Sequence, residues 1–403
     1  MAAPDPDQLL VFAHVPPPVH GQSLMVEFML KGLPRALPGV QIHHIDARFS
    51  RDMDDVGKGR LGKVLLAVKF ARLAISRRLK TGVNTLYYIP APAKRQAILR
   101  DCILLTLMRP FFRKIILHWH AVGLGDWIES KAQSGSLADK ILAKWHRWIL
   151  NSHHLSIVLT EWNRTGPAIY RPAHTAVVYN GLADPCPDFD RNILPVREKR
   201  RDLIKSENFD DTIKVGYIGH CTAEKGIFDF LEAIALANSQ KHPHEPILEA
   251  IVAGEFMEAA EKQRFENRIK DTNLLYNGRS LVTHLGFVSA EKKEEFWSQC
   301  DLLAFPTCYI AESFGLVAVE ALAHGITPVT SDWRMLPELM AQCHLPVSRA
   351  GDPTSLAHHL RSAIGRDNPA ALRRSYLNSF SLEAHIDGLS SAIRTSLNHQ
   401  SDR

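Results

Sequence analysis

The sequence lacks any apolar run of about 18 residues, the length at which a membrane-spanning helix is expected. Its start lacks the basic residues typical of a secretory signal peptide. The six cysteines include no Cys-x-x-Cys pair, which argues against a zinc ribbon or a redox pair. We find no internal repeat beyond the similarity of the two halves, and no low-complexity segment. These absences favour a cytoplasmic protein without a transmembrane helix.

The composition is that of an ordinary globular protein. Apolar residues make up 45% and charged residues 23% of the 403 positions, so the chain is long enough for two domains with sizeable cores. The formal net charge of +5 favours anionic partners in general. It does not choose among nucleotides, nucleic acid and lipid surfaces.

Apolar runs of strand length alternate with helical patterns in both halves, which predicts α/β domains with parallel sheets and right-handed crossovers. The predicted strands are 9–13, 42–45, 85–89, 115–120, 155–159 and 176–179, then 214–218, 248–253, 283–286, 302–305 and 327–330. We expect an N-terminal domain over 1–181, a linker and surface helix over 182–212, and a C-terminal domain over 213–375. The last segment, 376–403, is expected to be a helix that can cross back to the first domain.

The most informative stretch is 300–339, which predicts a strand, a loop, a helix over 314–324 and a second strand. A loop between a parallel strand and a helix N-terminus is where α/β proteins bind anionic ligands. Glu312 lies in this loop, and Glu320 follows about 80° further around a continuous helix. Carboxylates repel phosphate, so we expect both to accept hydrogen bonds from hydroxyl groups. A diphosphate flanked by a sugar and a ribose has the required groups.

Together these residues resemble a known family. Glu312, Phe314-Gly315-Leu316, Glu320 and the following Ala-x-Ala-x-Gly-x-x-Pro-Val look like the nucleotide-sugar signature of retaining glycosyltransferases of family 4. The resemblance implies the GT-B fold, in which two Rossmann-like domains face each other across a cleft. It covers most of the second half of the chain. In the first half it depends on the Gly21 loop and on one histidine-containing strand.

The resemblance also implies roles for individual residues. Glu312 would bind hydroxyls of the donor sugar, Glu320 the ribose, Lys225 the diphosphate, and backbone amides at 314–316 the phosphates or the sugar. The predicted donor-binding residues are Gly21, Gly219, His220, Lys225, Glu312, Ser313, Phe314, Gly315, Leu316 and Glu320. The predicted catalytic residues are His120, Glu312 and Lys225, with His118 as the alternative to His120.

The loop after the first predicted strand reads Pro-Pro-Pro-Val-His-Gly-Gln-Ser and includes Gly21. It does not match the Gly-x-Gly-x-x-Gly dinucleotide fingerprint. A glycine here allows a ligand to approach the backbone closely. A purely structural turn is an equally good explanation from the residues alone, and the resemblance raises Gly21 as a phosphate or acceptor contact.

His118 and His120 end a predicted strand, where residues two apart point to the same side. A metal pair is conceivable, but the spacing identifies no third ligand. The resemblance implies one histidine near the donor sugar. His120 matches better because a loop follows it directly, and a core role for either histidine stays open.

The segment 216–226 contains Gly219, His220 and the Lys225-Gly226 pair. Lys225 near a helix N-terminus would neutralise a diphosphate leaving group, and a solvated lysine is the simpler alternative. The family usually has an arginine where this chain has His220. An ordinary histidine is charged only below a pKa of about 6.5, so His220 would not give the diphosphate a permanent second cation beside Lys225.

Asp-x-Asp pairs can hold a divalent cation on a donor diphosphate when they directly follow an apolar strand. The three pairs here, Asp5/Asp7, Asp52/Asp54 and Asp188/Asp190, all lack such a strand. We therefore expect a reaction that needs no metal and no cofactor beyond the nucleotide-sugar substrate.

The segment 58–80 contains eight Lys or Arg residues and no Asp or Glu, with apolar residues at helical spacing. Such a helix can lie on an anionic membrane surface, and an ordinary domain helix with a basic face is an equal alternative. The aromatic and basic interleaving of nucleic-acid binders is not evident, so we expect no nucleic-acid partner.

These observations lead to one functional expectation. The chain would transfer a sugar from a nucleotide-diphosphate sugar to a glycan or lipid-linked acceptor, in the cytoplasm and peripherally on the inner membrane face. Polysaccharide or glycoconjugate biosynthesis would be the context. The alternatives are another GT-B enzyme, such as a sugar-nucleotide epimerase or a phosphorylase, and a non-catalytic partner subunit, which the departure at His220 favours.

Overall fold

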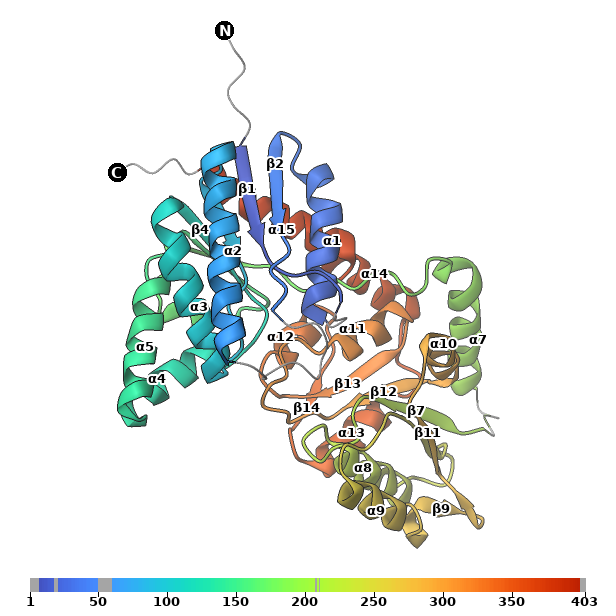
Figure 1. The fold of residues 1–403 in the computed structure, drawn as a ribbon. Coiled ribbons are helices and arrows are strands. Elements are labelled where there is room, and N and C mark those ends of the chain that lie inside the picture. Colours follow the sequence, from blue (N-terminus) through green and yellow to red (C-terminus); the bar gives the residue numbers. More distant parts are fainter. Residues whose placement is uncertain (1–6, 18–20, 50–59, 207–208, 210, 399–403) are drawn as a thin grey trace. The chain divides into compact units, whose positions relative to one another are not determined.

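The computed structural model describes residues 7–17, 21–49, 60–206, 209 and 211–398 (Figure 1). The chain divides into two compact units. The first contains residues 1–181 together with 382–403, and the second contains residues 182–381. Among the described helices, none combines the length and the apolar character needed to cross a membrane.

The first unit is built on a parallel sheet of six strands in the order β2-β1-β3-β4-β5-β6. Its strands are β1 (Asp7–Phe12), β2 (Val40–Ile45), β3 (Thr85–Tyr88), β4 (Lys114–Trp119), β5 (Leu155–Val158) and β6 (His174–Val177). The apolar residues of these strands run continuously because helices cover both faces of the sheet. In β1, Leu9 and Val11 enter one core, whereas Leu10 and Phe12 enter the other.

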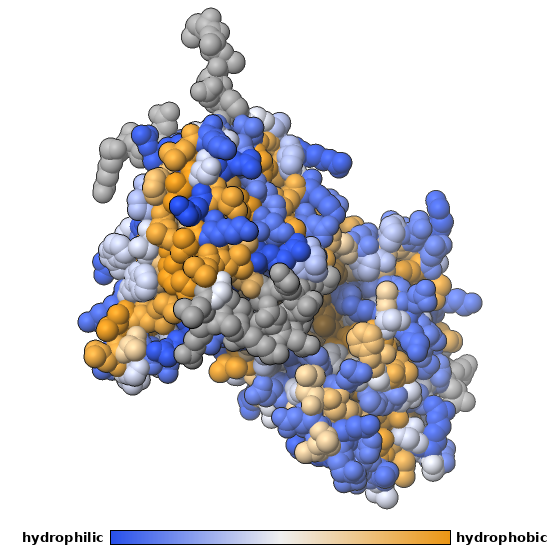
Figure 2. Space-filling model, viewed as in Figure 1, coloured by the Kyte–Doolittle hydropathy of each residue, from blue (hydrophilic) through white to orange (hydrophobic). Residues whose placement is uncertain are grey.

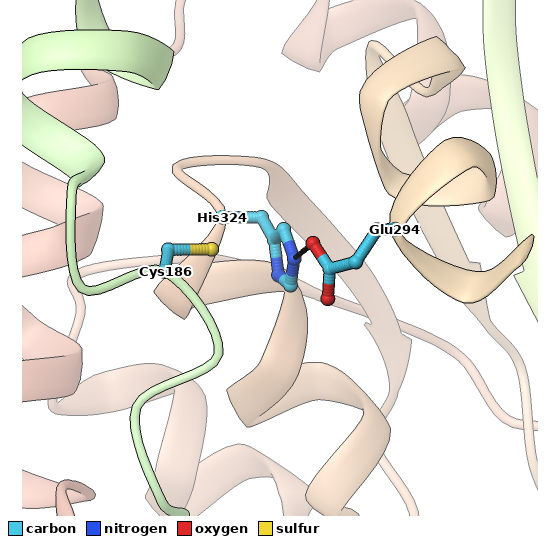
Figure 3. A group of neighbouring side chains, drawn as sticks. All are labelled: Cys186, Glu294 and His324. Carbon is cyan, nitrogen blue, oxygen red and sulfur yellow. Dashed lines mark hydrogen bonds and ion pairs between the residues drawn. The ribbon is translucent and has the colours of Figure 1, made fainter. Parts of the chain in front are cut away.

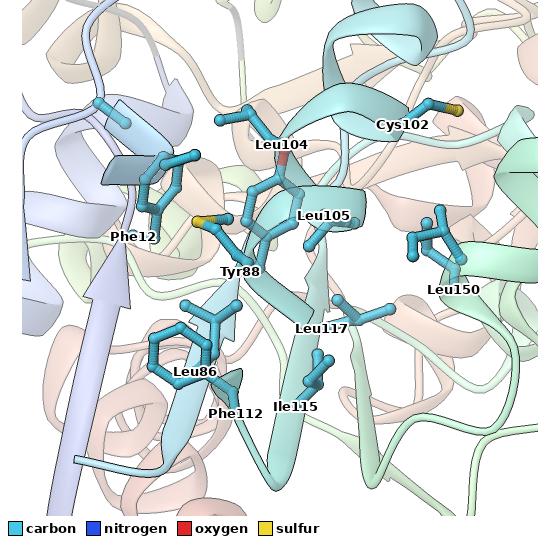
Figure 4. Close-up of a cluster of buried hydrophobic side chains, with 14 of the residues drawn as sticks. Phe12, Leu86, Tyr88, Cys102, Leu104, Leu105, Phe112, Ile115, Leu117 and Leu150 are labelled. Carbon is cyan, nitrogen blue, oxygen red and sulfur yellow. The ribbon is translucent and has the colours of Figure 1, made fainter. Parts of the chain in front are cut away.

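Helices α1 (Gly21–Ala36) and α15 (Leu382–Asn398) pack on one face of this sheet. The opposite face is covered by α2 (Arg60–Thr81), α3 (Arg95–Met108), α4 (Leu124–Ser134) and α5 (Leu137–Leu150), and Figure 4 shows part of the core beneath them. A short helix, α6 (Thr165–Ala168), precedes β6.

The C-terminal helix α15 is fixed to the first unit by lysine and arginine side chains. Lys114 Nζ donates hydrogen bonds to the carbonyl oxygens of Ser396 and Leu397, at 2.9 and 2.6 Å. A cation at a helix C-terminus also interacts favourably with the helix dipole. Arg394 donates to the carbonyl oxygen of Ala36 at the end of α1. Thus residues 382–398 fold with the N-terminal half of the chain.

The second unit contains another parallel six-stranded sheet, in the order β11-β8-β7-β12-β13-β14. Its strands are β7 (Ile213–Ile218), β8 (Leu248–Ala253), β11 (Val282–Gly286), β12 (Leu302–Phe305), β13 (Thr327–Ser331) and β14 (Val347–Ser348). A two-stranded antiparallel hairpin, β9 (Leu275–Tyr276) and β10 (Arg279–Ser280), lies outside it. The strand order reverses between β7 and β12. Such a switch point opens a crevice at the carboxyl ends of the strands.

The helices of the second unit alternate with its strands. They are α7 (Leu194–Ile204), α8 (Ile227–Ser239), α9 (Ala259–Arg268), α10 (Ala290–Gln299), α11 (Leu316–Ala323), α12 (Leu336–Ala341), α13 (Pro353–Ala363) and α14 (Pro369–Ser379). A π-helical stretch, Phe189–Ile193, leads into α7.

The segment expected as a linker and surface helix is bound to the second sheet. Arg200 on α7 forms an ion pair with Asp301, with Nε 2.9 Å from Oδ1, just before β12. Arg197 donates to the carbonyl oxygens of Trp297 and Cys300. Residues 182–206 are therefore part of the second unit.

Candidate functional site

Two loops flank the switch point of the second sheet. The first follows β7 and leads into α8, and the second follows β12 and leads into α11. The loops are joined by a hydrogen bond from the amide of Cys308 to the carbonyl oxygen of Glu224, at 2.7 Å. Gly226 packs so closely on the second loop that a Cβ atom there would lie 2.2 Å from Pro306 O. Glycine is thus required at the start of α8.

Lys225 and Glu312 bring a cation and an anion together at this point. Lys225 Nζ lies 2.5 Å from Glu312 Oε2 and 4.6 Å from the centroid of the Tyr309 ring. The two side chains of the ion pair are only 21% and 12% exposed. Partial burial increases the strength of their interaction relative to that of a surface pair. Two residues predicted from sequence are therefore direct neighbours.

A buried tyrosine holds the backbone of the first loop, between β7 and α8. Tyr217 Oη donates to the carbonyl oxygen of His220 at 2.8 Å, and it lies 3.4 Å from that of Lys225. Burial raises the pKa of Tyr217 well above its ordinary value, so this group stays a hydrogen-bond donor. The His220 side chain is exposed. Gly219 fits closely against the next loop, because a Cβ on Gly254 would lie 1.8 Å from Gly219 O.

The second loop is fixed by side chains at the end of β13 and just after it. Ser331 Oγ donates to the carbonyl oxygen of Thr307 at 2.6 Å, and Trp333 Nε1 donates to that of Tyr309 at 2.9 Å. The amide of Glu312 bonds the same Tyr309 oxygen at 3.1 Å. Sequence reasoning did not identify Ser331 or Trp333, whose only signal was their position at or just after the end of a strand.

Helix α11 begins at Leu316, two residues later than expected. Gly315 precedes it with φ +78°, and a Cβ there would lie 2.8 Å from Leu336 Cδ2, so the position strongly favours glycine. Phe314 is buried and packs edge-on against Phe380. The first amides of α11 have no partner inside the helix, which makes this end suitable for an anion. Ser313 lies half-buried just before it.

Because Glu312 precedes the helix, the predicted angle of about 80° between it and Glu320 does not apply. Glu320 is the fifth residue of α11, and its side chain is 13% exposed. Lys293 on α10 lies with Nζ 2.5 Å from Glu320 Oε1. Lys293 was not identified from the sequence, since nothing in its local pattern indicates a partner 27 residues away.

His118 and His120 belong to the first unit and lie side by side at the end of β4, with ring centroids 4.1 Å apart. His385 of α15 is the third member of this cluster, with its ring centroid 6.3 Å from that of His118. Tyr87 Oη is hydrogen bonded to His118 Nδ1. Burial, and secondarily the other two histidines, hold the pKa of His118 well below its ordinary value. Burial and His385 lower the pKa of His120 to about 3, so both rings are neutral at pH 7.

Gly21 is the exposed first residue of α1. Within the described part of the chain, a Cβ on Gly21 would meet no atom within 4 Å. The packing around this position therefore does not by itself demand glycine, and residues 18–20 of the same loop lie outside the described residues.

Of the Asp-x-Asp pairs, Asp5 and the pair Asp52/Asp54 lie outside the described residues, while Asp188 and Asp190 lie at the start of the π-helical stretch. Neither of the latter two belongs to a group of potential metal ligands among the residues that the structure describes.

The basic segment 58–80 is largely helix α2, although 58–59 and the side chains of residues 60, 61 and 63 are not described. Its inner face consists of Ala67, Ala71 and Ala74, all fully buried. Its outer face carries both basic and apolar side chains: Lys69, Arg72, Arg77 and Lys80 are exposed, and so are Leu65, Leu73 and Leu79.

A second exposed apolar stripe runs along α5. Leu137, Ile141 and Trp148 are 76%, 57% and 66% exposed, at a spacing that puts them on one side of the helix. Lys144 and Arg147 are exposed on the same helix. Helix α3 packs against both α2 and α5, so all three helices belong to one layer of the first unit. Figure 2 shows hydrophobic and hydrophilic side chains interspersed over α2 and α3.

The fold and the switch-point loops define an α/β protein of two doubly wound units, and in the second unit the N-terminus of α11 lies at the switch point. Residues 198–375 match the model of the family described as Glycosyl transferases group 1. Residues 198–375 of the second unit therefore form a domain of the group 1 glycosyl transferases. No curated protein matches the sequence significantly.

Solved structures confirm the GT-B fold. The lipopolysaccharide outer core galactosyltransferase WaaB in its apo form has a TM-score of 0.66 at 12% identity, covering 96% of this chain and 99% of that one. Sucrose-phosphate synthase from Thermosynechococcus elongatus has a TM-score of 0.60 at 18% identity, covering 96% and 98%. A trehalose-6-phosphate protein from E. coli bound with UDP-2-fluoro glucose has a TM-score of 0.61 at 11% identity, covering 98% and 100%.

Proposed function

We propose that this glycosyltransferase uses a nucleoside-diphosphate sugar as its donor and retains the anomeric configuration. The observation that carries the proposal is the partly buried pair Lys225–Glu312 at the switch point between β7 and β12. A similar structure bound with UDP-2-fluoro glucose supports a nucleotide-sugar donor. The retention of configuration is inferred from the family resemblance.

In this proposal each residue has a defined task. Lys225 stabilises the negative charge that develops on the leaving diphosphate, the usual purpose of a fixed cation in a partly buried site. Amides at the start of α11 bind the phosphates or the sugar, because helix N-termini favour anions. Glu312 accepts hydrogen bonds from sugar hydroxyls, and Glu320 from the ribose. Orientation of the donor supplies a further part of the rate.

His120 stays a predicted catalytic residue of the first unit, with His118 as its alternative. With its pKa lowered to about 3, a neutral His120 can donate or accept one hydrogen bond but supplies no fixed positive charge. Its proposed contribution is therefore a neutral hydrogen bond to a sugar hydroxyl group.

The exposed position of His220 bears on the second cation of the clamp. Where the resembled family has an arginine, this chain has a histidine that points to solvent. We infer that Lys225 and the helix amides hold the diphosphate mainly on their own. The reaction is proposed to proceed without a metal ion on the diphosphate.

The proposed acceptor is a glycan or lipid-linked molecule at the membrane surface, in polysaccharide or glycoconjugate biosynthesis. The mixed basic and apolar faces of α2 and α5 support this choice, since such helices bind anionic bilayers reversibly. A lipopolysaccharide galactosyltransferase among the similar structures is consistent with it.

A donor screen tests the proposal. The purified protein is incubated with UDP-, GDP- and ADP-sugars, with and without lipid-linked acceptors, and the products are resolved by mass spectrometry and NMR. We expect release of one nucleoside diphosphate and a new α- or β-linked sugar of the donor's own anomeric configuration. Epimerised donor, or sugar phosphate formed only with inorganic phosphate, would instead favour an epimerase or a phosphorylase. Donor binding without any turnover would favour a non-catalytic subunit.

A further inference from the structure

Three side chains that are far apart in the sequence meet in the second unit, away from the switch-point loops. They are Cys186, which precedes the π-helical stretch, Glu294 on α10, and His324 at the end of α11 (Figure 3). One ligand-type atom of each lies within 4.8 Å of the others. A thiol, an imidazole and a carboxylate form the ligand set that zinc prefers.

The hydrogen bonds of His324 determine which ring nitrogen is available. His324 Nδ1 lies 2.9 Å from the carbonyl oxygen of Glu320, which can only accept, so Nδ1 carries a proton. In a neutral ring, Nε2 then holds a lone pair and faces Glu294 Oε2 at 3.3 Å. Two acceptors in this position need a positive charge between them, either a proton or a metal ion.

The geometry agrees with a metal ion in that position. Zinc–nitrogen and zinc–oxygen bonds of about 2.0–2.1 Å in a tetrahedron separate the two ligand atoms by about 3.3 Å. The observed distance from Nε2 to Oε2 is 3.3 Å. A carbonyl oxygen bound to the other ring nitrogen is also the usual partner of a metal-ligating histidine.

The surroundings provide two buried ligands and one accessible ligand. Cys186 and His324 are each 3% exposed, whereas the Glu294 side chain is 54% exposed and can admit an ion from solvent. Burial raises the pKa of the Cys186 thiol to about 12, so zinc binding would have to displace its proton. The neighbouring Arg373 is neutralised by Asp184, with Nη2 2.5 Å from Oδ2.

We propose that Cys186, Glu294 and His324 bind one Zn²⁺ ion, with water in the fourth position. The ion would join the segment before α7 to α10 and to the end of α11. Trp297 of α10 stacks on His324 with ring centroids 5.1 Å apart, so the ring is already oriented. The site concerns the stability of the unit and is separate from the proposed metal-independent transfer reaction.

Zinc bound to this cluster would also affect the switch point, through the positions of α10 and α11. Glu294 is adjacent to Lys293, which pairs with Glu320, and the carbonyl of Glu320 bonds His324. A zinc ion would thus hold α10 and α11 in the relative position that the Lys293–Glu320 pair requires.

The test uses the untagged full chain treated with a chelator and then titrated with Zn²⁺ or Co²⁺ alone. We expect one tightly bound Zn²⁺ per chain, and with Co²⁺ the charge-transfer absorption that a thiolate ligand produces. Cys186→Ser should remove this absorption and weaken Zn²⁺ binding about 100-fold or more, since even residues supporting a ligand typically contribute 10–100-fold. Glu294→Gln changes a half-exposed side chain, should leave the fold intact, and should weaken binding at least about 10-fold.

Cys343→Ser is the matched control, because Cys343 is another thiol of the same unit that lies outside the cluster. It should leave zinc affinity and cobalt absorption unchanged. The proposal is overturned if Zn²⁺ binds with equal affinity in Glu294→Gln and wild type, or if cobalt gives no thiolate absorption. In either case a proton, not a metal ion, lies between His324 and Glu294.

Discussion

Lys225 Nζ lies 2.5 Å from Glu312 Oε2, so one ion pair joins the two loops on either side of the switch point between β7 and β12. A donor diphosphate bound to Lys225 would compete with Glu312 for the same ammonium group. Glu312 would then be released toward the hydroxyls of the sugar. This exchange gives the two residues opposite effects on nucleotide binding.

The first prediction separates these effects. Lys225→Gln should lower kcat/KM about 10²–10³-fold, the usual loss when one charge-stabilising donor is removed, and should also weaken nucleoside-diphosphate binding. Glu312→Gln should lower turnover while leaving nucleoside-diphosphate affinity equal or higher, because a competing anion is gone. Calorimetry and steady-state kinetics measure both quantities. Lys262→Gln, at an exposed lysine of α9, is the control, and weaker nucleotide binding in Glu312→Gln would contradict the exchange.

The second prediction concerns metal ions in transfer. If Lys225 and the amides of α11 hold the diphosphate, initial rates measured directly after adding EDTA should remain within about twofold of untreated enzyme. Loss of the proposed zinc ion would act through stability, so it should appear as faster thermal inactivation. Cys186→Ser protein lacks a ligand of the proposed zinc site. If EDTA abolishes its activity and only Mg²⁺ or Mn²⁺ restores it, the reaction itself needs a metal.

The third prediction concerns the membrane. Basic residues near an anionic surface contribute about 1 kcal/mol each, and salt screens them. The protein should therefore sediment with anionic liposomes at low salt and dissociate at high salt. Replacing Arg72 and Arg77 with Gln should reduce the low-salt binding, and Trp148→Ala should reduce the part that persists at high salt. If all variants bind the liposomes equally, or if the protein does not sediment with them at low salt, the prediction is wrong. In that case α2 and α5 are ordinary domain helices.

The fourth prediction concerns acid stability of the first unit. Burial lowers the pKa values of His146 and His153 to about 4, whereas an unfolded histidine titrates near about 6.5. A lowered folded pKa means that stability is present above about pH 6.5 and is lost as pH falls from there toward about 4. Each of the two histidines should make the free energy of unfolding about 2 kcal/mol lower at pH 5 than at pH 7.

Urea unfolding at pH 7 and pH 5 measures this loss. His146→Gln should reduce the difference between the two pH values, because a neutral amide does not titrate. The exposed His244→Gln should leave it unchanged. An unaltered pH dependence in His146→Gln would show that this ring is not the source of the acid sensitivity.

The strands were the most predictable part of the fold. Buried parallel strands read as continuous apolar runs, and every strand of the two six-stranded sheets except β14 begins and ends within two residues of its predicted bounds. Strand β14 and the hairpin of β9 and β10 have only two residues per strand, too few to produce a pattern. The start of α11 was misplaced because Gly315, at φ +78°, ends the loop and not the helix.

The sequence indicated single residues of the candidate site but not the contacts between them. Lys225 and Glu312 each carried a local signal, yet their pairing joins positions 87 residues apart. The pairing of Lys293 with Glu320, and the proximity of His385 to His118, likewise arise from helix packing. The cluster of Cys186, Glu294 and His324 has no spacing that a sequence motif could capture.

The central claim is that the switch point beside α11 binds a nucleotide with its ribose on Glu320. Calorimetric titration with UDP, GDP and ADP tests it most directly. For whichever nucleotide binds, Glu320→Gln should lower the affinity by about 1.5–3 kcal/mol, the contribution of a hydrogen bond to a charged group. Lys293→Gln controls for loss of the ion pair and should have the smaller effect, and Glu266→Gln on α9 should have none. Unchanged affinity in Glu320→Gln would contradict the account.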